Sequence, residues 1–305
     1  MRPLPLRDED RARLAAARWL APVGPFVAFE RSWTLYTDEP ALAALMADLY
    51  DDLLADGGDT TAHGDFRVVA ADGDQPSLVA RGEVRLGGGS TPGTTMSALV
   101  WGINRWVLDE ASRDHLLLHA GGVVRDDGSA VLLPAPSESG KSTLTTGLLD
   151  RGLTYLSDEA VALQPDRTVH GYAKPVSIDR GAWEVLAAHQ PTADDAGSAY
   201  LDRQWHVRAS RISPVARSGR LAAVIFPRYD PSAPPALRRL GPSEALLRAA
   251  NCTFAPGNGR TVELHQVTTL ATALAEVPAY ELVSGDLSAA CDAVLGVMDH
   301  IIEPA

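Results

Sequence analysis

The chain has 305 residues, of which 46% are hydrophobic and 22% are charged, as in an ordinary globular protein with a sizeable core. That length allows one large domain or two modest ones. The formal net charge of −12 argues against a nucleic-acid or anionic-membrane partner, because such partners need clustered Lys and Arg.

Cysteine content and hydropathy favour a cytoplasmic protein. Cys252 and Cys291 are too few for a disulfide framework and suit a reducing compartment. No window approaches the roughly 18 uninterrupted apolar residues of a membrane span. The opening residues MRPLPLRDEDRARL are charged where a signal peptide would be apolar. A homo-oligomer is compatible with the sequence.

Residues 1–95 are expected to form an α+β recognition or docking region. Apolar residues recur at helical spacing over 14–20 and 42–53. Residues 26–36 have the composition of a strand, and residues 66–85 are typical of a β-hairpin or meander. This region contains no clear chemical constellation.

The remaining part, 96–305, is expected to be an α/β domain with a mixed sheet. It starts with a helix over 95–108 and a buried strand over 115–124. Further on, the pattern predicts a helix over 180–189, a strand over 221–226 and a helix over 244–250. Residues 262–274 and 278–283 complete the α/β pattern, and 287–302 form a terminal amphipathic helix.

The strongest motif lies between residues 130 and 159, in AVLLPAPSESGKSTLTTGLLDRGLTYLSDE. A short apolar strand over 130–134 leads into a small-residue loop, and a helix starts at Lys141. Backbone N–H groups at such a helix start converge on one point and can hold polyphosphate. The residues expected to bind the nucleotide are Pro136, Ser137, Glu138, Ser139, Gly140, Lys141, Ser142 and Thr143.

Individual side chains of this motif match the parts of a nucleoside-triphosphate site. Lys141 would neutralise the β- and γ-phosphates, and the Ser142 hydroxyl would bind Mg²⁺. The strand over 153–156 carries Asp158 and Glu159 to the phosphate side, where a magnesium ligand or general base is needed. The expected metal ligands are therefore Ser142, Asp158 and Glu159.

The motif departs from the usual G-x-x-x-x-G-K-[ST] pattern at two positions. Ala135 replaces the first glycine, and Glu138 adds a carboxylate to a loop meant for anions. A loop with this sequence and no function is the alternative, which the strand, helix and acid pair around it disfavour.

Arginine replaces lysine almost everywhere, since only Lys141 and Lys174 among the 27 basic residues are lysines. A chain so biased is expected to retain lysine where a compact ammonium is chemically required. Lys174 is therefore a second candidate site residue, against the alternative of a chance surface lysine.

Residues 200–220 concentrate arginine in an otherwise acidic chain. They form either a solvated loop or a clamp on transferring phosphate, in which guanidinium groups stabilise the transition state. Arg203 and Arg220 are the preferred members of the clamp. His119, one predicted hairpin from the loop, is either a structural or a catalytic histidine.

Four segments together resemble the HPr kinase/phosphorylase group, a serine-kinase superfamily whose P-loop core is shared with bacterial phosphoenolpyruvate carboxykinase. They are LHAGGV at 118–123, PSESGKST at 136–143, RGLTYLSDE at 151–159 and PVARSGR at 214–220. The resemblance covers residues 116–226 well and the rest weakly.

The resemblance implies ATP and Mg²⁺ at Lys141 and Ser142, with Asp158 as the base that deprotonates the acceptor hydroxyl. It implies a supporting role for His119, an active-site arginine at Arg203, and a loop near the target at 217–220. The acid–arginine signature expected at 170–175 is replaced by Lys174, which argues against a phosphorylase reaction and against HPr as substrate.

The leading functional hypothesis is a kinase that transfers the γ-phosphoryl group of ATP to a hydroxyl. The acceptor would be a serine of a peptide or protein, or a small metabolite. The catalytic set is Asp158, His119, Lys141, Lys174, Arg203 and Arg220. The alternatives are a nucleotide-binding regulatory or docking module and an ATPase without phosphoryl transfer.

Overall fold

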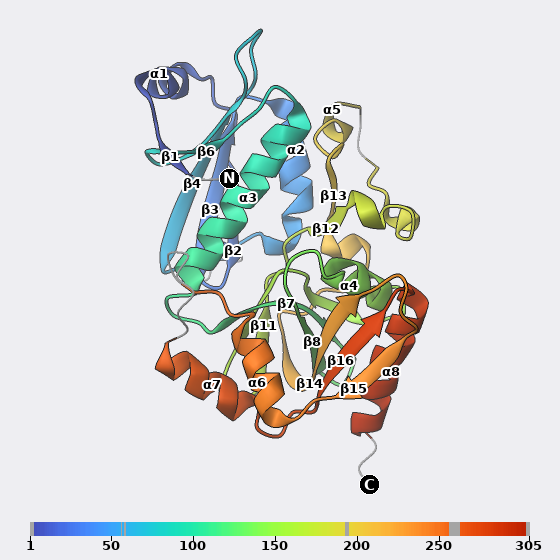
Figure 1. Ribbon diagram of the computed structural model, residues 1–305. Coiled ribbons are helices and arrows are strands. Elements are labelled where there is room, and N and C mark those ends of the chain that lie inside the picture. The colour runs from blue at the N-terminus through green and yellow to red at the C-terminus, as the bar shows by residue number, and fades with distance from the viewer. Residues whose placement is uncertain (1–2, 56, 58, 193–194, 256–262, 303–305) are drawn as a thin grey trace. The chain divides into compact units, whose positions relative to one another are not determined.

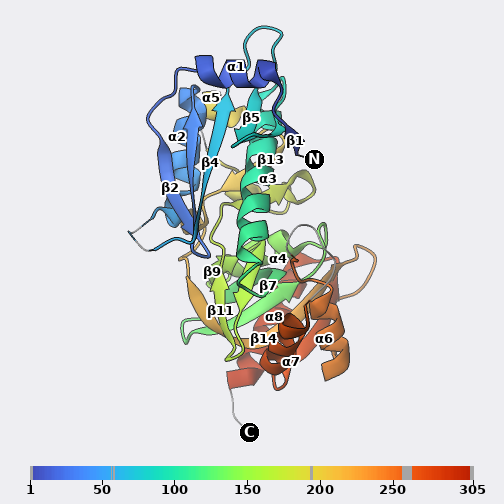
Figure 2. The ribbon, with the colours of Figure 1, turned by 90° about the vertical axis from the view of Figure 1, so that its left-hand side faces the viewer.

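The computed structural model describes residues 3–55, 57, 59–192, 195–255 and 263–302. It has a mixed α/β fold, as the sequence predicts, and the backbone contacts divide it into two compact units (Figures 1 and 2). Unit 1 comprises residues 1–110, 177–183 and 188–208, and unit 2 comprises residues 111–176, 184–187 and 209–305. The sequence boundary at residue 95 thus falls inside unit 1, and the docking role of residues 1–95 stays a prediction.

Unit 1 is built on a six-stranded sheet in the order β1-β6-β5-β4-β3-β2. Its strands are β1 (Leu4–Pro5), β2 (Val23–Ala28), β3 (Arg31–Thr37), β4 (Ala62–Val69), β5 (Leu78–Arg81) and β6 (Val84–Gly87). The predicted strand over 26–36 is therefore two antiparallel strands, β2 and β3. The meander predicted over 66–85 is present as β4, β5 and β6.

Helices pack on this sheet through aromatic and small residues. They are α1 (Asp8–Ala16), α2 (Pro40–Leu49), the 3₁₀ turn η1 (Asp51–Leu53) and α3 (Pro92–Ala111). Trp106 of α3 lies against Gly64 of β4, where a Cβ would come within 3.1 Å of the indole. Leu14 of α1 packs with Leu78 and Ala80 of β5.

A smaller part of unit 1 comes from residues 177–183 and 188–208. It pairs β12 (Val176–Asp179) with β13 (Gln204–Val207) and contains α5 (Asp195–Ser198). The helix predicted over 180–189 is wrong, because this stretch holds only the 3₁₀ turns η2 (Arg180–Ala182) and η3 (Ala187–His189). A tertiary contact explains the difference, since the Trp183 ring stacks on Trp205 at 4.8 Å, with only 5° between the ring planes.

Unit 2 contains a mixed sheet in the order β11-β10-β7-β8-β14-β16-β15, with β9 also paired to β7. Its strands are β7 (Leu117–Val124), β8 (Ser129–Pro134), β9 (Thr154–Ser157), β10 (Ala160–Leu163), β11 (Thr168–Gly171), β14 (Ser218–Tyr229), β15 (Ala236–Arg239) and β16 (Ala279–Ser284). β8 is antiparallel to β7 and parallel to β14.

Helices cover both faces of this sheet. They are α4 (Lys141–Leu149), the turn η4 (Ala209–Arg211), α6 (Pro242–Ala250), α7 (Leu264–Leu274) and α8 (Leu287–Ile302). Ala130 and Leu132 of β8 share a core with α6 and α7, whereas Gly121 and Leu133 face Thr145 of α4. Residue 262, where the sequence places the start of α7, lies outside the described residues.

No helix in the described part of the chain is long and apolar enough to cross a membrane. The predicted cytoplasmic location stays a prediction.

Candidate functional site

The loop between β8 and α4 contains two residues with left-handed backbone conformation. Gly140 adopts φ = 87° immediately before the first turn of α4, and Glu138 adopts φ = 63°. Left-handed residues that alternate with right-handed ones turn successive N–H groups toward one side. The Ser139 hydroxyl is buried within the loop and has no hydrogen-bond partner in the described residues. The loop therefore offers donors that a ligand oxygen could satisfy.

Lys141 and Ser142, at the start of α4, point to two different parts of the site. The Lys141 ammonium is buried and donates to the carbonyl oxygens of Ala135 at 2.8 Å and Pro136 at 2.7 Å. Burial lowers the pKa of Lys141, an effect that Glu159 opposes. The Ser142 hydroxyl instead donates to Asp158 Oδ2 at 3.2 Å.

Asp158 and Lys174 form a buried ion pair next to the loop. The Lys174 Nζ lies 2.8 Å from Asp158 Oδ1, and each side chain is only 1% exposed. The hydroxyl of Tyr155 donates to the same oxygen at 2.8 Å and lies 3.1 Å from the Lys174 carbonyl oxygen. Asp158 Oδ1 thus accepts from two groups, while Oδ2 is directed to Ser142. Both lysines singled out in the sequence meet at this site, neither of them on the surface.

His119 and Glu159 form a second pair beside the loop. His119 Nε2 lies 3.7 Å from Glu159 Oε1. Burial, together with the positive charges of Lys141 and Lys174, lowers the pKa of His119 to about 4. Burial also raises the pKa of Glu159 above its ordinary value, although the two lysines oppose this. His119 is therefore neutral at pH 7, and Glu159 is a stronger base than an exposed glutamate.

The backbone of His119 connects these groups to the rest of unit 2. Its carbonyl oxygen accepts from the Ala135 N–H at 3.3 Å, and its N–H donates to the Cys252 carbonyl at 2.6 Å. The Phe254 ring lies 5.4 Å from the imidazole. Burial also raises the pKa of Cys252, so that its thiol stays protonated.

The structure brings most of the predicted site residues together. Lys141, Ser142, Asp158, Glu159, His119 and Lys174 are linked by the contacts above. Of the remaining loop residues, Pro136, Ser137 and Glu138 are exposed, while Ser139, Gly140 and Thr143 are partly buried.

Two predicted arginines are not part of this cluster. Arg220 pairs with Ser129, at the start of β8, whereas the loop follows Pro134 at the strand's other end. Arg220 therefore lies away from the loop cluster, and its role in a phosphate clamp stays a prediction. Arg203 belongs to unit 1, where it lies beside Gly93, and its catalytic role stays a prediction.

Four residues were missed in the sequence. Tyr155 contacts Asp158, Cys252 and Phe254 contact His119, and Tyr229 lies 3.6 Å from the position of a Cβ on Gly140. Of these four, only Tyr155 could have been identified from the sequence, because a tyrosine hydroxyl in a buried strand must find a hydrogen-bond partner.

Comparisons with known proteins find similarity to solved structures but none to family models or curated sequences. No protein-family model matches the chain, and no curated protein matches it. Among solved structures, the chain is similar to the HPr(Ser) kinase/phosphatase from Coxiella burnetii, with a TM-score of 0.31 and 14% identity over 60% of this chain and 95% of that one. At this TM-score the match carries no argument about chemistry, and membership of the family that the motifs resemble stays a prediction.

Proposed function

We propose that the protein is an ATP- and Mg²⁺-dependent kinase that phosphorylates a hydroxyl group of a peptide, protein or small metabolite. The observation that carries this proposal is the cluster of Lys141, Ser142 and the buried Asp158–Lys174 pair at the start of α4. Charges buried this deeply are costly to a fold and are concentrated at functional sites.

The nucleotide phosphates would bind the loop N–H groups, the Ser139 hydroxyl and Lys141. Lys141 would exchange its two backbone carbonyl partners for phosphate oxygens, to which a charged donor bonds more strongly. Ser142 Oγ and Asp158 Oδ2, which lie 3.2 Å apart, are the oxygens that would hold Mg²⁺. The ion would neutralise charge on the transferring phosphate.

Phosphoryl transfer forms a bond between the acceptor oxygen and the γ-phosphorus and breaks the bond from that phosphorus to the β,γ-bridging oxygen. ADP leaves, and the acceptor proton passes to a carboxylate. Asp158 is the base implied by the resemblance, but its Oδ1 already accepts from Lys174 and Tyr155. We assign the proton to Glu159, whose raised pKa suits this role, and the metal to Asp158.

The test measures ATP binding and phosphate transfer separately. Lys141→Ala should weaken ATP binding roughly 10- to 100-fold, because one charged hydrogen-bonding group is lost. Glu159→Gln should leave binding within a few fold and reduce transfer by at least about 100-fold. Arg239→Ala, on exposed β15, is the matched control and should change neither quantity.

A second function, a nucleotide-binding regulatory module, is favoured by Glu138 and by the crowding at Asp158 Oδ1. ATP binding that needs Lys141, with no phosphate on any acceptor and no ADP formed, would support that module. If ATP does not bind, both functions are excluded. Turnover that is unchanged in Glu159→Gln would contradict the base assigned here.

A further inference from the structure

A second concave site of unit 2 lies at the other ends of β8 and β14. The parallel register pairs Ser129 with Arg220 at the start of these strands. Pro134 at the end of β8 leads to the loop, and Tyr229 at the end of β14 lies beside Gly140. At about 3.3 Å per residue, roughly 16 Å of strand separates the second site from the loop.

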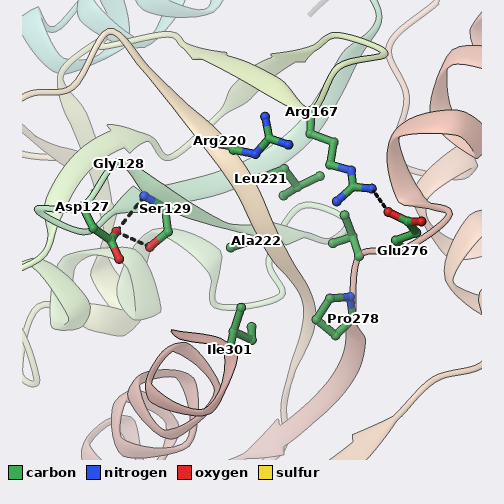
Figure 3. A pocket seen from close by; sticks show the side chains of 11 residues that line it. Asp127, Gly128, Ser129, Arg167, Arg220, Leu221, Ala222, Glu276, Pro278 and Ile301 are labelled. Atoms are coloured by element: carbon green, nitrogen blue, oxygen red, sulfur yellow. Dashed lines mark hydrogen bonds and ion pairs between the residues drawn. The ribbon is translucent and has the colours of Figure 1, made fainter. Parts of the chain in front are cut away.

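This site is a pocket with a volume of about 350 Å³, which lies in the range of small-molecule sites. Figure 3 shows Arg167 and Arg220 along one rim, and Pro278 and Ile301 along the opposite rim. Leu221, Ala222 and Val277 also line it. Asp127 and Glu276 line it as well, so the pocket combines two guanidinium groups and two carboxylates with an apolar surface.

The two arginines differ in how their charge is used. Arg167 forms an ion pair with Glu276 (Figure 3). Arg220 is exposed and makes no ion pair or side-chain hydrogen bond with any described residue; Asp166 is influenced by its charge but forms its own bonds with Thr168. The guanidinium of Arg220 is thus available to an incoming anion.

Asp127, on a third side of the pocket, limits the charge of a ligand. Its Oδ1 accepts from the Ser129 N–H at 2.8 Å and from the Ser129 hydroxyl at 2.6 Å, which holds the carboxylate in place (Figure 3). A ligand with anionic groups at both ends would bring one of them toward this carboxylate. A single anionic group at the arginine rim avoids that repulsion.

The backbone around the arginines is held by hydrogen bonds that cross between elements. Arg167 has φ = 73°, and its carbonyl oxygen accepts from the Leu221 N–H at 2.8 Å. Arg220 donates its N–H to Gly128 at 2.9 Å. A β-bulge between Leu221 and Ala223 turns Ala222 out of register with β8. These features hold the backbone from which both arginine side chains extend.

We propose that this pocket binds a small organic monoanion. Arg220, supported by Arg167, would hold its carboxylate, and Leu221, Val277, Pro278 and Ile301 would contact its apolar body. This inference does not rest on the kinase proposal, because no pocket residue belongs to the loop cluster.

The experiment uses the full chain and three probes that separate charge from apolar contact. Benzoate has both features, benzamide lacks the charge and acetate lacks the ring. Calorimetry at millimolar probe should find that benzoate binds at least about tenfold more tightly than either of the others. Arg220→Ala should weaken benzoate binding by about tenfold or more, whereas Arg220→Lys should retain part of it.

Two further variants distinguish this pocket from other anion sites. Arg239→Ala controls for surface charge, and Lys141→Ala controls for the loop; both should bind benzoate like the wild type. The proposal is overturned if benzamide binds as well as benzoate, if Arg220→Ala binds it normally, or if Lys141→Ala abolishes binding. Absence of benzoate binding at millimolar concentration also overturns it. Circular dichroism checks that each variant is folded, which is expected for the exposed Arg220 and Arg239 and must be shown for the buried Lys141.

Discussion

The two ends of the β8–β14 pair use charge in opposite ways. At the loop end, Lys174 and Asp158 are each 1% exposed and satisfy one another in the interior. At the pocket end, Glu276 is 78% exposed although it also pairs with an arginine. Breaking a buried pair leaves a charge without solvent, whereas an exposed charge returns to water at little cost. Burial, more than the presence of an ion pair, distinguishes the two ends.

The largest expected effect comes from breaking the buried pair. Lys174→Met should lower the free energy of unfolding by about 3–5 kcal/mol, because Asp158 keeps a buried charge without its partner. Urea denaturation measures this loss in the free energy of unfolding. The double variant Lys174→Met/Asp158→Leu should recover much of the loss. A cost below about 1 kcal/mol for the single variant would remove the contrast between the two ends.

The second effect is a pH dependence of the stability of the fold, which arises from His119 at the loop end. The unfolded chain protonates His119 near its ordinary pKa of 6.5, but the folded chain does so only near about 4. Between these values the unfolded state binds more protons, so falling pH destabilises the fold, by about 2 kcal/mol from pH 7 to 5.

Thermal or urea unfolding across this pH range tests the effect. Between pH 7 and 5, the free energy of unfolding of His119→Asn should decrease by about 2 kcal/mol less than that of the wild type. His265→Asn is the control, since this histidine is 69% exposed. If the free energy of unfolding changes equally with pH in the wild type and in His119→Asn, the histidine titrates in the fold as it does in the unfolded chain.

The third effect comes from relieving backbone strain at one residue of each end. Glu138 and Arg167 are both non-glycine residues with positive φ. Glu138→Gly should raise the free energy of unfolding by about 0.5–1 kcal/mol, because relief of the left-handed strain exceeds the added entropy of the unfolded chain. It should also tighten ATP binding by removing a carboxylate from the loop.

Arg167→Gly is the matched variant at the pocket end and should have a similar effect on stability without changing ATP binding. Tighter ATP binding in Arg167→Gly, or weaker binding in Glu138→Gly, would contradict the assignment of phosphate binding to the loop.

The smallest effect is expected from the exposed pair of Arg167 and Glu276. A double-mutant cycle with alanine at both positions should give a coupling energy below about 1 kcal/mol. The coupling should decrease further in high salt, because exposed charges are screened. A coupling as large as that of Lys174 with Asp158 would show that exposure does not separate the two ends.

The contrast also shows where prediction from sequence succeeded. The strand–loop–helix at 130–149 and the acids after β9 were predicted because local apolar patterning and turn residues specify such units. Lys174 was found through composition alone, and it is fully buried beside Asp158. The identification of this core as a P-loop kinase core stays a prediction.

Two features that the sequence did not predict have the same physical origin. Arg220 ends the segment that resembles a target loop, but the parallel pairing of β14 with β8 places it at the end of these strands that lies away from the helix start. The helix expected over 180–189 is replaced by turns that seat Trp183 on Trp205. Strand direction and ring stacking depend on distant residues, which local patterning does not include.

By itself, the sequence determined the loop, its lysine and hydroxyl, and the acid pair that follows, because these features depend on neighbours in the chain. Only the tertiary structure decided that Lys174 and Tyr155 share one oxygen of Asp158, that His119 is neutral beside Glu159, and that Arg220 borders a different pocket. Partner choice, burial and strand direction arise from packing between segments far apart in sequence, and they set the charge state and surroundings of every group at both sites.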